Sequence, residues 1–329
     1  MPLTEKLLIA RIRDRTTRKR GVAAGIGDDC AILQIPAGQQ TLVTTDFSLE
    51  GIHFRREWHP PEVVGHRCLT RGLSDIAAMG GTPVAAFLSL ALPGNLRQAW
   101  VDQFVKGLLK LGHSFNVSLA GGDTAQSPNG ILADIVVVGS VPQGKAIQRS
   151  GARAGDRIYV TGALGGAAAT LELLSDGKKL RPADYPGHFY PIPRVEVGRF
   201  LREKGLAAAM IDLSDGLSTD LGHICDESGV GAEIWVDAVP CAKIGKPTHK
   251  VDIQFALHGG DDYELLFTAH KGKRVPPRIA GVDITQIGQI ARGRQVILIN
   301  HGGGRTELHP QGWEHFKQRA RSLEPETGT

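Results

Sequence analysis

The sequence has few cysteines and no metal–thiolate pattern. Its four cysteines, Cys30, Cys68, Cys225 and Cys241, form no CxxC pair. This spacing argues against a zinc ribbon and gives no disulfide framework. Free thiols fit a reducing compartment, so we expect a cytoplasmic protein.

Long apolar segments are also missing. The longest apolar run, residues 84–92, is interrupted by Ser89 and lies between Pro83 and Pro93. It is well short of the ~20 residues that span a bilayer. The first fifteen residues, MPLTEKLLIARIRDR, contain no apolar stretch of the signal-peptide kind. We therefore expect a soluble protein with no membrane partner.

Several common functional signatures are absent as well. The 38 Lys and Arg against 34 Asp and Glu leave a net charge of +4, which is too mild to indicate a nucleic-acid partner. The sequence has no GxxxxGK[ST] phosphate loop, no HExxH zinc motif and no Gly-x-Ser-x-Gly nucleophile elbow. P-loop, zinc-protease and serine-hydrolase chemistry are therefore disfavoured.

Glycine, by contrast, is in excess. The chain has 42 glycines in 329 residues, about 13 % against an average of roughly 7 %. Because there is no Gly-x-y period or Gly/Ser tract and 41 % of the residues are hydrophobic, these glycines punctuate a folded chain. A length prior of roughly 100 to 200 residues per domain predicts two domains.

Short apolar segments bounded by Gly, Pro or Asp predict strands, and apolar residues at three- and four-residue spacing predict helices. The expected strands are 41–45, 84–92, 131–138, 157–161, 232–236, 265–268 and 296–299, and the expected helices are 61–79, 96–111 and 194–204. This is a mixed α/β (α+β) pattern. The polar stretch 146–156 separates an N-terminal domain, 1–148, from a C-terminal domain, 149–329. Gly162, Gly165 and Gly166 follow a strand but lack the GxGxxG spacing, so we expect close backbone packing there.

Acidic residues beside Gly, Ser, Thr or another acid form six clusters. They are Asp28-Asp29, Asp46, Asp75, Asp123, Asp212 with Asp215, and Asp261-Asp262. Asp46, Asp123 and Asp212 are expected to end or follow an apolar strand. Converging carboxylates repel one another unless a cation neutralises them, which favours Mg²⁺. Because Mg²⁺ takes few carboxylates and fills its shell with phosphate oxygens, several Mg²⁺ ions shared with a polyphosphate are expected.

A structural interpretation competes with this one. A single Gly-Asp or Ser-Asp pair is usually a turn or a helix N-cap, and only the six clusters together favour ligand binding. Glycine beside an aspartate also lets phosphate oxygens approach backbone N–H groups. Ser214, in Asp-Leu-Ser-Asp-Gly, lacks the first glycine of a nucleophile elbow. It is better interpreted as a hydrogen-bond donor.

The motifs occur in a characteristic order: GIGDDCA, TTDFSLEGIHF, LSDIAAMGGTP, GGDT, RSGARAGD, IDLSDGLSTDLGHI, GGDDYELLF and finally GWEHF. In this the sequence resembles the thiamine-monophosphate kinase family, which shares a superfamily with aminoimidazole ribonucleotide synthetase, selenophosphate synthetase and a hydrogenase maturation factor. The resemblance implies a two-domain aminoimidazole ribonucleotide synthetase-like fold whose N-terminal domain forms a shared barrel in a homodimer. It also implies ATP-dependent phosphorylation of thiamine monophosphate to thiamine diphosphate.

Carried over motif by motif, the resemblance implies three groups of site residues. The Mg²⁺ ligands are Asp29, Thr44, Thr45, Asp46, Asp75, Asp123, Asp212 and Asp215; the nucleotide contacts are Gly122, Asp123, Arg149 and Ser214; the substrate contacts are His53, Asp261 and Trp313. Two positions depart from the family pattern: Asp261 replaces a usual Glu, and Val105 replaces a common Tyr. No covalent nucleophile or general base is expected, because a phosphate monoester with a second pKa of ~6 is already anionic near neutral pH.

Two other functions remain open at this point. One is another ATP-dependent activity of the superfamily, such as the aminoimidazole ribonucleotide synthetase reaction. The other is a non-catalytic nucleotide-binding maturation partner. Selenophosphate synthetase is disfavoured because no Cys stands in a glycine-rich N-terminal segment. The kinase is favoured because the His53 motif and GWEHF accompany the acidic clusters.

Overall fold

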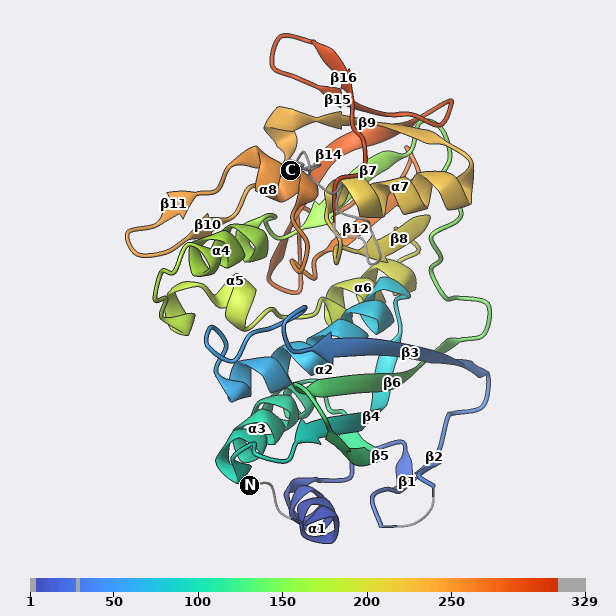
Figure 1. Ribbon diagram of the computed structural model, residues 1–329. Coiled ribbons are helices and arrows are strands. Elements are labelled where there is room, and N and C mark those ends of the chain that lie inside the picture. The colour runs from blue at the N-terminus through green and yellow to red at the C-terminus, as the bar shows by residue number, and fades with distance from the viewer. Residues whose placement is uncertain (1–3, 28–29, 313–329) are drawn as a thin grey trace, which may run out of the picture.

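Four long strands and two helices form the N-terminal part of the computed structural model, which describes residues 4–27 and 30–312. The strands are β3 (Gln39–Leu49), β4 (Thr82–Pro93), β5 (Ser118–Ser127) and β6 (Leu132–Pro142), paired in the order β3-β6-β4-β5 with only β4 and β5 parallel. Helices α2 (Pro61–Ala78) and α3 (Gln98–Ser114) pack on this sheet. Helix α1 (Glu5–Arg15) and the pair β1 (Val22–Ala24) and β2 (Ile32–Leu33) lie at its far end (Figure 1).

A larger sheet forms the C-terminal part. Its order is β16 (Arg305–Glu307), β15 (Val296–Ile299), β9 (Gly231–Trp235), β14 (Val282–Ala291), β7 (Arg157–Thr161), β12 (Leu265–Ala269) and β8 (Ala209–Asp212), with β13 (Arg278–Ile279) beside β14. The helices are α4 (Gly166–Ser175), α5 (Pro186–Phe189), α6 (Val195–Glu203), α7 (Leu217–Ser228) and α8 (Ile253–His258). Two 3-10 turns (Pro182–Asp184 and Val236–Ala238) and the hairpin β10 (Lys243–Ile244) with β11 (His249–Lys250) complete the described chain.

Helix α2 lies between the two sheets. Of its 18 residues, 13 are buried, so it is an interior helix rather than a surface one. Alternate residues of a strand face opposite sides of the sheet. One face packs with α2 and α6 through Tyr159, Met210 and Phe267. The other face packs with α7 and α8 through Ile158, Ile211 and Leu266. One hydrophobic core therefore runs from the N-terminal sheet, through α2, to the C-terminal sheet.

The predicted mixed α/β architecture is confirmed, and each expected strand and helix overlaps an observed one. The expected strand ends are wrong at two of the three aspartates. Asp46 lies inside β3 opposite Ile135, and Asp123 lies inside β5 opposite Ser89, because the polar residues that follow them continue the strand pairing. Asp212 does end its strand, β8. Among the described residues, no helix is long and apolar enough to cross a membrane.

Glycines permit two kinds of close approach. Gly165 has φ of +82°, and a Cβ there would lie 2.6 Å from the backbone N of Ala256. This confirms the packing role expected after β7. In addition, a Cβ on Gly65 of α2 would overlap the carbonyl of Phe104, and one on Gly107 of α3 would overlap the carbonyl of Glu62. The two helices therefore touch backbone to backbone.

Gly107→Ala should destabilise the fold by about 1–3 kcal/mol, because the added methyl group must push α2 and α3 apart. A lowered melting temperature in circular dichroism would show this. Gly272→Ala is the matched control, since a Cβ there has no neighbour within 4 Å. Equal melting temperatures for the two variants would contradict the proposed backbone contact.

Candidate active site

Three carboxylates from both sheets and from α2 meet at the junction of the two parts. Asp46 comes from β3, Asp75 from α2 and Asp212 from the end of β8. The Thr44 hydroxyl donates a hydrogen bond to Asp75 Oδ2, and the Ser74 hydroxyl donates to Asp212 Oδ2 at 2.6 Å. We call Asp46, Asp75 and Asp212 the acidic cluster.

Burial and mutual repulsion make these carboxylates hold protons unusually well. Burial, followed by the charge of Asp75, raises the pKa of Asp46 to about 7 and that of Asp212 to about 7. Burial also raises the pKa of Asp75, although the Thr44 hydrogen bond and two arginines, Arg149 and Arg71, oppose the change. The positive charges nearby therefore compensate the acidic cluster only in part.

The donor set of the acidic cluster fits a divalent cation such as Mg²⁺. Its carboxylates and the Thr44 hydroxyl offer hard oxygen ligands, which Mg²⁺ prefers to nitrogen or sulfur. A bound cation would neutralise the negative charge that the nearby arginines leave uncompensated. Arg149 lies in the loop after β6, is exposed, and acts electrostatically on both Asp75 and Asp212.

Two other predicted ligands lie on the outer face of the N-terminal sheet. Consecutive strand residues point to opposite faces, so Thr45 points away from the acidic cluster and donates to Asp134 Oδ1 at 2.7 Å. Asp123 is exposed on β5, two strands beyond β6, and accepts from the Thr124 N–H at 2.8 Å. Within one chain, the side chains of Thr45 and Asp123 are not brought together with the acidic cluster.

A cavity of about 640 Å³ borders Gly122 and Asp123. Its walls come from α1, residues 25–27 and 30–31, β4 and β5, and they include Ile12, Phe87 and Leu119. At Gly122 φ is +147° and a Cβ would overlap the Leu88 carbonyl, so a side chain is excluded there. The cavity combines an apolar wall with a carboxylate, as small-molecule sites commonly do.

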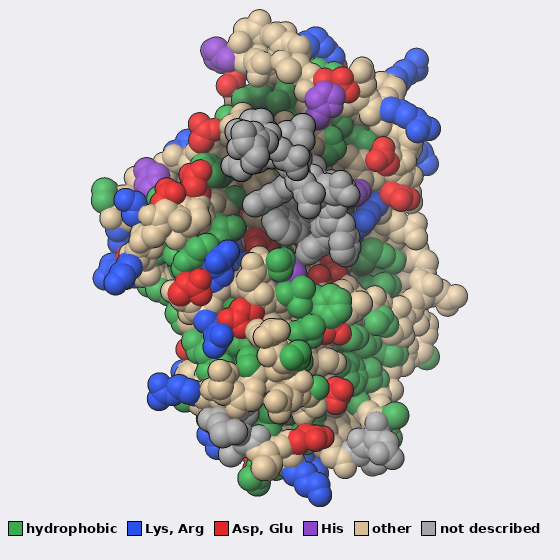
Figure 2. All heavy atoms as spheres, in the orientation of Figure 1, with side chains coloured by type: hydrophobic (Ala, Val, Ile, Leu, Met, Phe, Trp, Pro, Cys, Tyr) green, Lys and Arg blue, Asp and Glu red, His purple; other side chains and the backbone are tan. Residues whose placement is uncertain are grey.

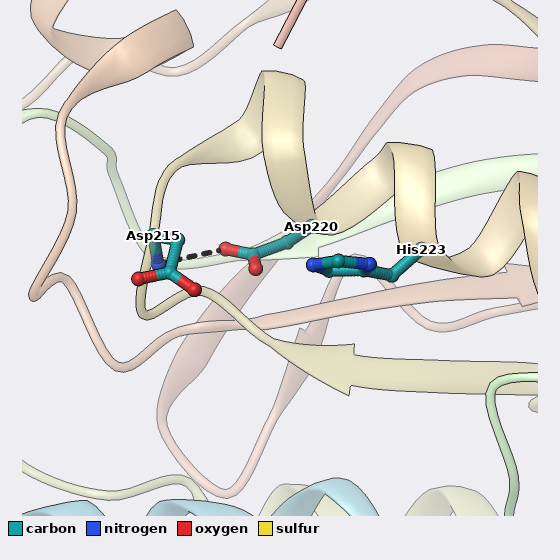
Figure 3. Close-up of side chains that lie close together, drawn as sticks. All are labelled: Asp215, Asp220 and His223. Carbon is teal, nitrogen blue, oxygen red and sulfur yellow. Dashed lines mark hydrogen bonds between the residues drawn. The ribbon is translucent and has the colours of Figure 1, made fainter. Parts of the chain in front are cut away.

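The loop 214–216 is held by a residue that the sequence did not single out. Asp220 Oδ2 accepts hydrogen bonds from the backbone N–H groups of Ser214 (3.1 Å), Asp215 (3.1 Å) and Gly216 (3.0 Å). Figure 3 shows Asp220 between Asp215 and His223. One side-chain oxygen or nitrogen atom of each residue lies within 4.8 Å of those of the other two. Burial, then Asp212, raises the pKa of Asp220 to about 8. Asp220 is thus an anchor for the loop that carries Ser214 and Asp215, and the spacing in DGLSTD was its sequence signal.

Each acidic side chain of the Gly-Gly-Asp-Asp-Tyr-Glu motif is engaged by the protein. Asp262 accepts from the Gly165 N–H at 2.6 Å, at the start of α4, and Glu264 pairs with Arg194. Asp261 accepts from Arg67 Nη2 (2.7 Å), Arg71 Nη2 (3.3 Å) and the Tyr263 hydroxyl (2.5 Å).

Burial alone would raise the pKa of Asp261, but Arg67 and Arg71 hold it below its ordinary value. Sequence reasoning missed both arginines. Their signal was the four-residue spacing that places Arg67, Arg71 and Asp75 on one face of α2.

The remaining predicted residues are placed as follows. His53 lies in the turn after β3, and its Nδ1 accepts from the Leu49 N–H at 3.0 Å, so the proton of the neutral ring is on Nε2. Val105 is a buried core residue of α3. Asp29 and Trp313 lie outside the described residues.

Comparison with known proteins gives a consistent result. The family model of the AIR synthase related protein N-terminal domain matches residues 27–141, and that of the C-terminal domain matches residues 153–299. The chain is 38% identical over 330 residues to a thiamine-monophosphate kinase of Salmonella typhimurium, covering 96% of this chain and 99% of the relative. The Bacillus subtilis thiamine-monophosphate kinase is 32% identical, covering 94% and 98%.

Solved structures agree with the sequence comparison. The thiamine-monophosphate kinase of Stenotrophomonas maltophilia matches with a TM-score of 0.77 and 37% identity, covering 91% of this chain and 97% of that one. A structure described as AaThiL complexed with AMPPCP and TMP matches with a TM-score of 0.76 and 33% identity, covering 86% and 89%. The chain therefore belongs to the thiamine-monophosphate kinase family, within the AIR synthase related proteins.

Proposed function

We propose that this chain phosphorylates thiamine monophosphate with ATP and releases thiamine diphosphate and ADP. The observation that carries the proposal is the buried acidic cluster, in which burial raises the pKa of all three carboxylates and the charge of Asp75 raises those of Asp46 and Asp212 further. Such a cluster suits cation-assisted phosphoryl transfer between two anions. The curated relatives are thiamine-monophosphate kinases, and one solved relative holds AMPPCP, an ATP analogue, and TMP. The free thiols Cys68 and Cys225 support a cytoplasmic location.

We assign Mg²⁺ binding to the acidic cluster and to the other predicted ligands. These are Thr44, Asp46, Asp75 and Asp212 at the junction, Asp215 in the 214–216 loop that follows Asp212, Thr45 and Asp123 on the outer face, and Asp29. When bound, Mg²⁺ offsets and orients the charges of the phosphates. Arg149, exposed beside the acidic cluster, is a cationic clamp for the transferred phosphate. Ser214, Gly122 and Asp123 contact the nucleotide, while His53 and Trp313 contact the substrate.

The transfer itself needs positioning rather than a base. A phosphate oxygen of thiamine monophosphate attacks the γ-phosphorus of ATP in line, and the bond from that phosphorus to the β–γ bridging oxygen breaks. The attacking oxygen is anionic near neutral pH, because the second pKa of a phosphate monoester is ~6. Holding two anionic phosphates close together is therefore the main task of the residues around the acidic cluster.

We further propose a homodimer that pairs through the outer face of the N-terminal sheet and forms a shared barrel. α2 and α3 cover the inner face, whereas Val43 and Phe47 of β3 are 66% and 55% exposed. In Figure 2, hydrophobic side chains gather over the lower half of the molecule, where Figure 1 places this sheet. Pairing would bury these residues and bring Thr45, Gly122 and Asp123 to the subunit boundary.

Purified protein with thiamine monophosphate, ATP and excess Mg²⁺ should form thiamine diphosphate and ADP in equal amounts, without orthophosphate. Chromatography of the nucleotides and thiamine esters measures this ratio. Asp46→Asn removes one carboxylate of the acidic cluster and should lose turnover while keeping its far-ultraviolet circular dichroism.

Other outcomes separate the competing functions. Orthophosphate equal to ADP would indicate the aminoimidazole ribonucleotide synthetase type of reaction. Nucleotide binding without turnover of thiamine monophosphate would indicate a maturation partner. Normal turnover by Asp46→Asn would overturn the role of the acidic cluster.

Phe47→Asp should convert the dimer to a monomer, because it places a charge in the middle of the proposed apolar interface. Light scattering coupled to size-exclusion chromatography reads the mass directly. Ile192→Asp is the matched control, since Ile192 is 58% exposed but lies outside the N-terminal sheet. A dimer that survives Phe47→Asp would contradict this interface.

A further inference from the structure

A stripe of charge runs along one face of α2. Arg67, Arg71 and Asp75 are spaced by four residues, so their side chains leave the same side of the helix. The stripe points toward the C-terminal part, because Arg67 and Arg71 reach Asp261 and the neighbouring Ser74 reaches Asp212. Arg71 therefore lies beside the acidic cluster, and Arg67 lies one helical turn further away.

Arg67 is fixed in place. One of its terminal nitrogens donates to Asp261 Oδ2 at 2.7 Å and the other donates to the carbonyl of His188, and its side chain is only 5% exposed. The Tyr263 hydroxyl donates to the other oxygen of Asp261 at 2.5 Å. Both Asp261 and Tyr263 have positive φ, +66° and +51°. A strained backbone conformation persists only where the surrounding structure constrains it. The orientation of Asp261 is therefore tightly determined.

Arg71 is held less completely. Among the described residues, its one hydrogen bond runs from Nη2 to Asp261 Oδ1 at 3.3 Å, and its side chain is 14% exposed. On the other side, its charge acts on Asp46 and Asp75, whose pKa values it lowers. The guanidinium group thus contacts Asp261 and lies within electrostatic range of the acidic cluster, and the described residues leave most of its N–H donors unused.

The charge balance of this group favours an anion. Arg67 and Arg71 carry two positive charges against the single negative charge of Asp261, so the three residues together are cationic. With two arginines and a tyrosine already bound, Asp261 is poorly suited to hold a cationic thiazolium ring. An anionic phosphate beside the acidic cluster could accept hydrogen bonds from the unused N–H donors of Arg71.

We infer that Arg71 binds the phosphate of the acceptor substrate, and that Asp261 is a positioning residue which orients Arg71 instead of contacting the substrate. The inference rests on the proposed function for the identity of the acceptor. Arg71 then holds the acceptor phosphate on one side of the acidic cluster, while Arg149 holds the donor phosphates on the other. In this arrangement, each of the two anions has its own cation.

Arg71→Gln should raise KM for thiamine monophosphate about 10- to 100-fold, as expected when a charge-assisted hydrogen bond is lost. KM for ATP should stay within about twofold. Calorimetry on the same variants should show weaker binding of thiamine monophosphate and unchanged binding of thiamine, which lacks the phosphate. Arg199→Gln, at an exposed residue of α6, is the matched control.

Arg71→Lys keeps the charge without the fork and guards against a folding defect in Arg71→Gln. Its KM for thiamine monophosphate should lie between those of the wild type and Arg71→Gln. Asp261→Asn should raise the same KM, but should add little in the Arg71→Gln background, because both changes remove one interaction. Additive effects of the two substitutions would overturn the positioning role of Asp261.

Other results would contradict phosphate binding by Arg71. Unchanged KM for thiamine monophosphate in Arg71→Gln would overturn it, as would equal weakening of thiamine and thiamine monophosphate or a rise confined to KM for ATP. A wild-type enzyme that does not phosphorylate thiamine monophosphate would instead overturn the proposed function, so the two failures are distinguishable.

Discussion

The burial of α2 between the two sheets is the constraint on which the site depends. Because both sides of the helix are covered, its charged residues Arg67, Arg71 and Asp75 have little access to bulk water. A buried charge is costly unless it is paired. Asp261, in the loop after α8, supplies the partner of both arginines from the C-terminal part, and Asp75 accepts a hydrogen bond from Thr44 of β3. The same packing that joins the two parts of the chain thus also assembles the site.

The charges around α2 are unbalanced in two places. Near Asp261, two arginines and a tyrosine surround a single carboxylate. Near Asp46, Asp75 and Asp212, three carboxylates share the partial compensation of Arg71 and Arg149, and their pKa values rise. An excess of positive charge therefore lies beside an excess of negative charge. We propose that the substrate phosphate neutralises the excess of positive charge and that Mg²⁺ neutralises the excess of negative charge.

The sequence predicted the elements well because apolar periodicity follows burial, and it found the carboxylates because they lie in short motifs with glycine, serine, threonine or another acid. It could not separate Thr44 from Thr45, since only the position of α2 decides which face of β3 is inside. Arg67 and Arg71 escaped notice because arginine on a helix usually indicates a solvated face. Their partner Asp261 is 194 and 190 residues away in the sequence. Asp29 and Trp313 stay predictions.

In the proposed site, Mg²⁺ binds where buried carboxylates otherwise hold protons. This binding is tested most directly by calorimetric titration of the protein with Mg²⁺ in buffers of different ionisation enthalpy. Because Asp46 and Asp212 each have a pKa of about 7 without metal, binding near neutral pH should release about one proton per chain. The release should fall above pH 8 and be reduced in Asp46→Asn. Mg²⁺ binding that releases no proton at neutral pH would contradict the account.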